Sequence, residues 1–103
     1  MDESLTKNFN KYEKKLVDFI KNYPFPIGIK IYLYGSRARR DHDESSDLDL
    51  AFENLPEKFH LFDFEEELDK QNIPYHTDLT NLKNCSEDFK KQFYEHCILI
   101  HET

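Results

Sequence analysis

The residues best suited to chemistry are two alternating aspartates, Asp47 and Asp49, and a Gly35-Ser36 turn that lies ten residues before them. Residues two apart in a strand point to the same side, so both carboxylates would leave one face of a sheet. Two carboxylates held about 4 Å apart repel each other by roughly 1 to 4 kcal/mol, and a divalent cation removes that repulsion. Mg²⁺ is the ion expected, because it prefers hard oxygen ligands and phosphate substrates.

The turn follows an apolar alternation over residues 27–34, which predicts a half-buried strand. The alternating residues are Ile27, Ile29, Ile31 and Leu33. Gly35 lets the backbone approach a ligand closely, and Ser36 is expected to cap a short helix over residues 37–40. The free N–H groups at the start of that helix would suit an anion such as a triphosphate.

Residues 35–50, GSRARRDHDESSDLDL, resemble the signature of polymerase-beta-like nucleotidyltransferases, in particular the minimal MNT antitoxins that pair with HEPN toxins. The resemblance extends over most of the chain. It implies that the glycine-serine turn holds nucleotide phosphates, that the Asp-x-Asp pair binds Mg²⁺, and that a later strand supplies a third carboxylate. Asp78 fits the third position, because it lies in a β-prone segment over residues 75–80.

The resemblance therefore predicts a two-metal site. Its catalytic and metal-binding residues are Asp47, Asp49 and Asp78, its cofactor is two Mg²⁺ ions, and its substrate is ATP. Its nucleotide-binding residues are Gly35, Ser36, Arg37 and Arg39. His76 is a weaker candidate for nucleotide contact, because it would share the face of Asp78.

All three arginines of the chain lie within residues 37–40, whereas the eleven lysines are scattered. Guanidinium groups suit phosphate or carboxylate oxygens, so this concentration favours a polyphosphate or an acidic partner surface. The alternative is a solvated helix face. Arg40 stands where relatives often have glycine, so the end of the short helix is expected to differ here.

Three functions are compatible with this pattern. The resemblance favours an adenylyltransferase that moves AMP from ATP to a tyrosine of a HEPN toxin, forming a hetero-oligomer with it. A catalytically silent antitoxin that blocks its toxin by occupancy is the alternative, and an antibiotic nucleotidyltransferase is a third. The sequence leaves open the nucleotide preferred, the acceptor residue, the number of transfers, the activity of this copy and the stoichiometry of the complex.

The composition bounds the remaining classes. With 103 residues, we expect a single domain over residues 1–103. A formal charge of −7 argues against direct nucleic-acid binding, which needs a basic surface. The sequence shows no signal peptide, no membrane-length apolar run and no metal-spaced cysteines, so a cytoplasmic location is expected.

The elements predict an α/β (α+β) fold. A mixed three- or four-stranded sheet should carry helices on one face and the site at its edge on the other face. This layout matches the palm-like core of the family that the sequence resembles. Helical spacing runs from Leu5 to Tyr23, and a second helix is expected from Pro56, with Phe59, Phe62 and Leu68. Ser86 should cap a last helix, and the apolar tail over residues 97–100 should complete the core or add an edge strand. The fifteen aromatic residues are explained equally well by core packing and by an exposed interface patch.

Overall fold

The computed structural model describes residues 8–103, and Leu5 of the predicted first helix lies outside the described residues. The first described helix begins at Lys11, after Asn10. The Asn10 side chain accepts hydrogen bonds from the Tyr12 and Glu13 backbone N–H groups, and the Glu13 carboxylate accepts one from the Asn10 N–H. This reciprocal capping box fixes where the helix starts.

Side-chain caps also begin α4 and the 3₁₀ helix, but not α2 or α3. Ser86 accepts a hydrogen bond from the Phe89 N–H at 3.1 Å, which confirms the predicted cap. The predicted start at Pro56 is wrong, because Pro56 begins a turn closed by the Phe59 N–H, and the helix starts at Leu61. The helices are α1 (Lys11–Asn22), α2 (Ser36–Arg39), α3 (Leu61–Asp69), the 3₁₀ helix η2 (Leu82–Asn84) and α4 (Glu87–His96).

Four strands form one mixed sheet in the order β3-β2-β1-β4. Strand β1 runs antiparallel to β2 and β4, whereas β2 and β3 are parallel. The apolar tail adds the edge strand β4 and also buries Ile100 in the core, so both predicted roles hold. Ile27 was predicted to belong to the first strand, but that strand begins at Lys30, and Ile27 is 94% exposed. The strands are β1 (Lys30–Tyr34), β2 (Leu48–Glu53), β3 (Thr77–Asn81) and β4 (Ile98–Glu102).

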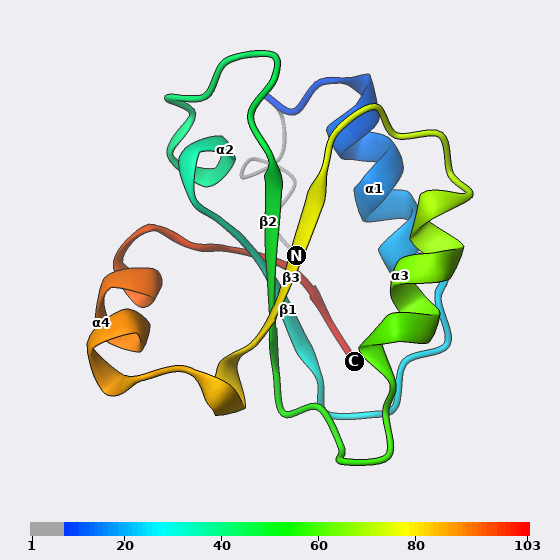
Figure 1. Cartoon of the computed structure of the whole chain (residues 1–103), viewed down its shortest axis with the longest axis vertical. Helices are drawn as coiled ribbons and strands as arrows, with labels where there is room; N and C mark the ends of the chain where they lie inside the picture. The colour runs from blue at the N-terminus through cyan, green and yellow to red at the C-terminus, as the bar shows by residue number, and fades with distance from the viewer. Residues whose placement is uncertain (1–7) are drawn as a thin grey trace.

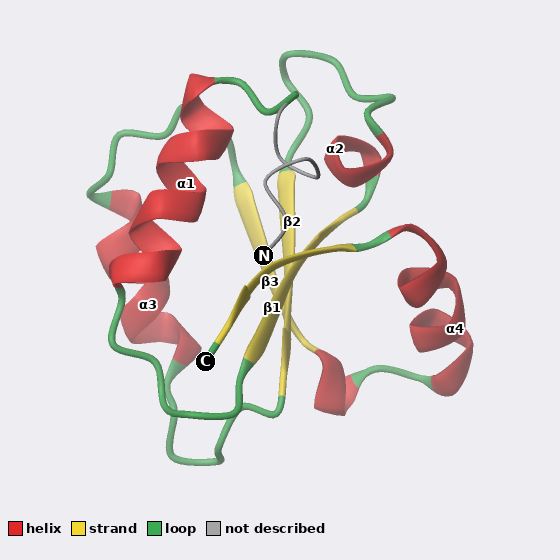
Figure 2. Cartoon of the chain, turned by 180° about the vertical axis from the view of Figure 1, so that it is seen from behind, coloured by secondary structure: helices red, strands yellow, loops and turns green. Residues whose placement is uncertain are grey.

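The helices lie on both sides of this sheet. Figure 1 shows α1 and α3 together on one face and α2 with α4 on the other, and Figure 2 shows the same division from behind. Helices were predicted on one face of the sheet only. This holds for α1 and α3, whereas α4 lies on the second face. Packing explains it, because Tyr32 and Ala51 form a second apolar cluster with Phe93 of α4.

The main core lies between the sheet and the pair α1 and α3. It contains Leu48 and Leu50 of β2 and the fully buried Phe64 of α3. Phe62, which was predicted to face the core, is 67% exposed. A separation of two residues along a helix places Phe62 and Phe64 on opposite sides, so only one of them can face the sheet.

The two faces of the sheet determine the side to which Asp49 points. Because Leu48 and Leu50 point into the main core, Asp49 between them points to the face that carries α4. No helix within residues 8–103 combines the length and the apolar character that a membrane crossing requires.

Candidate functional site

The sheet register brings the predicted carboxylates to one end of the sheet. Asp49 of β2 lies opposite Tyr34 of β1 on one side and opposite Asp78 of β3 on the other. Asp47 is exposed and directly precedes β2. The Leu48 N–H donates to the His76 carbonyl at 2.9 Å, which fixes the entry of β3 beside the entry of β2. Three segments that are distant in sequence thus meet at one sheet end.

The electrostatics of Asp49 show that these carboxylates share one field. Burial raises the pKa of Asp49 above its ordinary value, and the negative charges of Asp78 and Asp47 raise it further. The charges of His76 and Arg39 lower the same pKa, but this effect is smaller than the increase caused by burial and by the two carboxylates. A cation placed among these carboxylates would relieve the repulsion.

Gly35 lies directly against Asp49. Its φ angle is +74°, a left-handed conformation that favours glycine, and a Cβ atom built on it would overlap Asp49 Oδ2. Glycine is therefore required for two independent reasons, the backbone conformation and the closeness of the carboxylate. Gly35 is also the N-cap of α2, and Ser36 is its first helical residue, so the predicted side-chain cap by Ser36 is wrong.

Arg37 is fully buried and does not face the site, which revises its predicted nucleotide-binding role. Its Nε donates to the Ser46 carbonyl at 3.0 Å, and its Nη1 lies 3.2 Å from Glu13 Oε2. Its guanidinium also stacks on the Tyr75 ring, 3.9 Å from the ring centroid. A guanidinium with all these partners has no surface left for a phosphate, so the role of Arg37 is structural.

These contacts make Arg37 the meeting point of the three site segments. It belongs to the helix that follows Gly35, it binds the residue before Asp47, and it packs on the segment that leads to Asp78. Glu13 completes the network from α1, and sequence reasoning missed it. Its signal was the Asn-x-x-Glu spacing of the capping box, which predicts the cap but not the buried ion pair.

Arg40 ends α2 in a backbone conformation that glycine adopts more easily. Its φ angle is +62°, a left-handed conformation that costs an ordinary residue about 1 to 2 kcal/mol. Its Nη1 lies 2.8 Å from Glu13 Oε2 and its Nη2 lies 3.1 Å from Glu13 Oε1. Burial alone would raise the pKa of Glu13, but the hydrogen bonds from Arg40, the Asn10 N–H and Arg37 lower it overall. The ionised Glu13 therefore offsets the strain at Arg40.

Arg39 is the arginine of this helix with a free approach to the site. Its side chain is 44% exposed, its Nε donates to Asp41 Oδ2 at 3.0 Å, and it lines a cavity of about 280 Å³ together with Gly35. An exposed ion pair of this kind contributes little to stability, so the guanidinium can exchange Asp41 for another anion at small cost.

The residues fit a divalent metal bound together with a substrate. Within residues 8–103, no three acidic, histidine or cysteine side chains gather into a complete metal cluster. Mg²⁺ needs no such cluster, because it usually keeps several waters and is held by one or two carboxylates plus substrate phosphates. Asp49 with Asp78 opposite it supplies that donor set, and Gly35 lies directly against Asp49.

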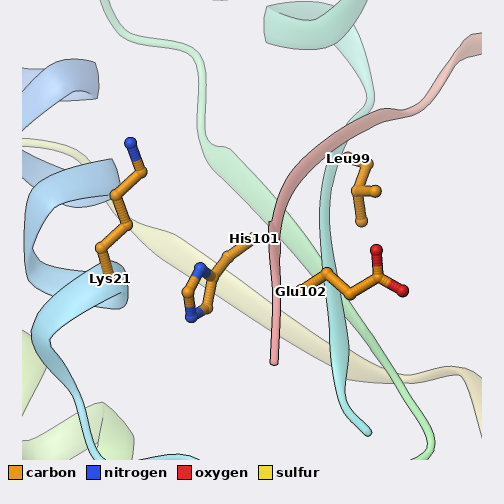
Figure 3. Close-up of a pocket in the computed structure, with 4 residues that line it drawn as sticks. All are labelled: Lys21, Leu99, His101 and Glu102. Carbon is orange, nitrogen blue, oxygen red and sulfur yellow. The ribbon is translucent and has the colours of Figure 1, made fainter. Parts of the chain in front are cut away.

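A wider cavity lies elsewhere. Figure 3 shows it against the edge strand, lined by Lys21 of α1 and by Leu99, His101 and Glu102 of β4, with a volume of about 460 Å³. None of the predicted site residues lines it. Burial lowers the pKa of His101, and the Lys21 ammonium lowers it further. This cavity therefore lies apart from the predicted site, whereas Gly35 and Arg39 of that site line the smaller cavity.

Comparisons with known proteins show the family of this chain. The family model described as polymerase beta, nucleotidyltransferase, matches residues 14–103. The chain belongs to this nucleotidyltransferase family. The match includes the glycine-serine turn and all three predicted carboxylates. A search among curated proteins found no significant sequence match.

Two solved structures from toxin–antitoxin systems have a fold similar to that of this nucleotidyltransferase. One, a toxin–antitoxin with AMP-PNP, aligns with a TM-score of 0.68 and 19% identity over 91% of this chain and 75% of that chain. A second, a mutant of the toxin–antitoxin MntA-HpeT, aligns with a TM-score of 0.61 and 22% identity over 88% of this chain and 72% of that chain. The four-stranded mixed sheet is therefore the nucleotidyltransferase fold of these neighbours.

The buried position of Arg37 predicts that Arg37→Ala and Arg39→Ala differ strongly, although both lie in α2. Loss of the buried guanidinium should lower the free energy of unfolding by about 3 to 5 kcal/mol, because Glu13 and the Ser46 carbonyl lose a partner. Arg39→Ala should change it by less than about 0.5 kcal/mol. Urea unfolding of both variants measures the difference, and equal losses would contradict the structural role of Arg37.

The raised pKa of Asp49 predicts that Asp49→Asn stabilises the ligand-free protein at neutral pH, by up to roughly 1 kcal/mol. A carboxyl whose pKa is higher in the folded state than in the unfolded state makes the protein less stable as pH rises through that pKa. The stability gained by Asp49→Asn should therefore shrink as pH falls toward about 4, where the wild-type carboxyl becomes neutral as well. Thermal melts across this pH range test it, with the exposed Asp18→Asn as control. A destabilised Asp49→Asn at neutral pH would show that Asp49 is a structural residue.

Proposed function

We propose that this nucleotidyltransferase uses Mg²⁺ and ATP to transfer AMP to a tyrosine hydroxyl of a HEPN-type toxin, and so acts as its antitoxin in the cytoplasm. The observation that carries the proposal is the convergence of Gly35, Asp49 and Asp78 at one sheet end, with no room for a side chain at Gly35. The structural neighbours from toxin–antitoxin systems support a protein partner.

The roles of the residues follow from their positions. Asp47, Asp49 and Asp78 would hold the metal, and bound there Mg²⁺ would neutralise triphosphate charge and make the acceptor hydroxyl more acidic. Gly35 and Ser36 would hold the phosphates, because the glycine lets them approach the backbone. The exposed guanidinium of Arg39 would add a charge-assisted contact to a phosphate oxygen.

The transfer itself balances simply. The acceptor hydroxyl gives its proton to water, its oxygen forms a bond to the α-phosphorus of ATP, the bond from that phosphorus to the bridging oxygen breaks, and pyrophosphate leaves. Asp78 lies on the edge strand β3, where an acceptor from another protein can approach it from outside the sheet. Positioning the three groups in line is the main contribution expected of the protein.

The test separates a catalyst from a protein that only occupies its partner. A substoichiometric amount of the chain with Mg²⁺ and ATP should modify the whole pool of the protein encoded by the neighbouring gene, because a catalyst turns over. Intact mass spectrometry should show that partner heavier by one or more AMP units, located on tyrosine. The double variant Asp47→Asn with Asp49→Asn should abolish the modification, and Asp18→Asn should retain it.

One result would contradict the enzymatic proposal. If the partner remains unmodified and is inhibited only at equimolar ratio, the chain acts by occupancy as a silent antitoxin. Modification of a small-molecule antibiotic in place of the partner would assign the third function.

A further inference from the structure

The cavity beside Gly35 extends away from the carboxylates toward α4. Its volume is about 280 Å³. Gly35 and Arg39 line one part of it, and Phe89, Gln92 and His96 of α4 line another. In Figures 1 and 2, α2 and α4 lie on the same side of the sheet, so this cavity lies between two elements that face the site.

The walls of this cavity suit a flat, neutral ring. Phe89 keeps 36% of its surface exposed, although it packs edge-on to Tyr34 at 6.0 Å and parallel to Phe93 at 6.2 Å between ring centroids. An aromatic side chain anchored on one side and open on the other is a stacking platform for a base. Gln92 beside it carries both a donor and an acceptor, which a purine edge requires.

The charge of the cavity also fits a nucleotide. None of its lining residues is acidic, and Arg39 supplies a positive charge, although the chain as a whole carries −7. Three other cavities within residues 8–103 each include a glutamate or an aspartate in their lining. An electron-rich base joined to a triphosphate would be repelled least here.

The sheet order decides between the nucleotide and the acceptor as the occupant. The strands run β3-β2-β1-β4, so the Asp78 strand and the Gly35 turn lie on opposite sides of β2. Under the proposed function, the acceptor approaches from the Asp78 side and the phosphates lie at Gly35. The cavity continues from Gly35 and away from Asp78, and so it lies on the nucleotide side.

We propose that this cavity binds the purine base of the nucleotide, with Phe89 stacking on the ring and Gln92 hydrogen-bonding its edge. The inference rests on the proposed nucleotidyltransferase function and adds residues that choose the nucleotide. Neither Phe89 nor Gln92 belongs to the glycine-serine and aspartate motif, so they can vary without loss of the phosphate and metal site.

The experiment compares a nucleotide with its phosphate part alone. Calorimetry measures the binding of ATP, GTP and inorganic tripolyphosphate, each with Mg²⁺, to the wild type and to Phe89→Ala and Gln92→Ala. Phe89→Ala should weaken ATP binding about tenfold and leave tripolyphosphate binding unchanged, because only the base is stacked. Gln92→Ala should reduce the preference between ATP and GTP. Phe62→Ala removes an exposed aromatic ring from α3 and should change nothing.

The outcomes separate the two proposals. If the wild type binds ATP and both variants bind it as tightly as the wild type does, the base lies elsewhere and only this inference fails. If transfer is nevertheless slower in these variants, the cavity is an acceptor pocket. Equal weakening of ATP and tripolyphosphate would also overturn it. If the wild type binds neither ligand, the proposed function itself fails. Gln92 is exposed on its helix, so Gln92→Ala keeps the test valid even if Phe89→Ala unfolds.

Discussion

A buried ion pair between Glu13 and Arg37 holds together the parts of the chain that form the site. Removing charges from water is costly, so such a pair persists only when hydrogen bonds satisfy both groups. Here Glu13 accepts from Arg37, Arg40 and the Asn10 N–H, and Arg37 also donates to the Ser46 carbonyl. Because these partners lie on three separate segments, which are the start of α1, the helix α2 with Arg40 and the residue before Asp47, the pair sets the position of the turn and of Asp47 relative to α1.

Two opposite electrostatic environments lie within a short stretch of this chain. Around Glu13 positive charge exceeds negative charge and the pKa of the carboxyl is lowered, whereas around Asp49 burial and negative neighbours raise it. Protonation of Glu13 at low pH would weaken the network, while protonation of Asp49 relieves repulsion. The charge of Glu13 is therefore neutralised by neighbouring arginines, whereas the charges around Asp49 repel each other. An acidic cluster of this second kind is the feature expected of a cation-binding site.

The sequence was sufficient for much of the fold and for the proximity of the predicted carboxylates Asp49 and Asp78. Alternation placed β1 and β2, the serine before a helical pattern gave the α4 cap, and Asp78 was expected beside the second strand, where the register puts it next to Asp49. The two strands and the cap depend on local spacing, which a single sequence records, whereas the role of Asp78 as third carboxylate was implied by the family resemblance. The nucleotide and metal roles of these residues stay predictions.

The errors at Arg37 and Phe62 have a common origin, because each concerns a choice between faces that only tertiary packing makes. Arg37 matched a phosphate-binding pattern, but its side chain points inward to Glu13. Phe62 and Phe64 are equally apolar, and the phase of α3 decided which one is buried. The cavity between α2 and α4 could not be foreseen, since it required α4 to cross to the second face. A local pattern does not fix such long-range choices.

The most direct test of the account is the dependence of ATP affinity on Mg²⁺, measured by calorimetry in the wild type, Gly35→Ala and Gly28→Ala. Both glycines have positive φ angles, but a Cβ at Gly28 meets nothing within 4 Å, whereas at Gly35 it would overlap Asp49. The account predicts that Mg²⁺ strengthens ATP binding to the wild type and to Gly28→Ala, and that Gly35→Ala loses this binding. Equal ATP affinity with and without Mg²⁺, or unchanged binding in Gly35→Ala, would contradict a metal-nucleotide site at this turn.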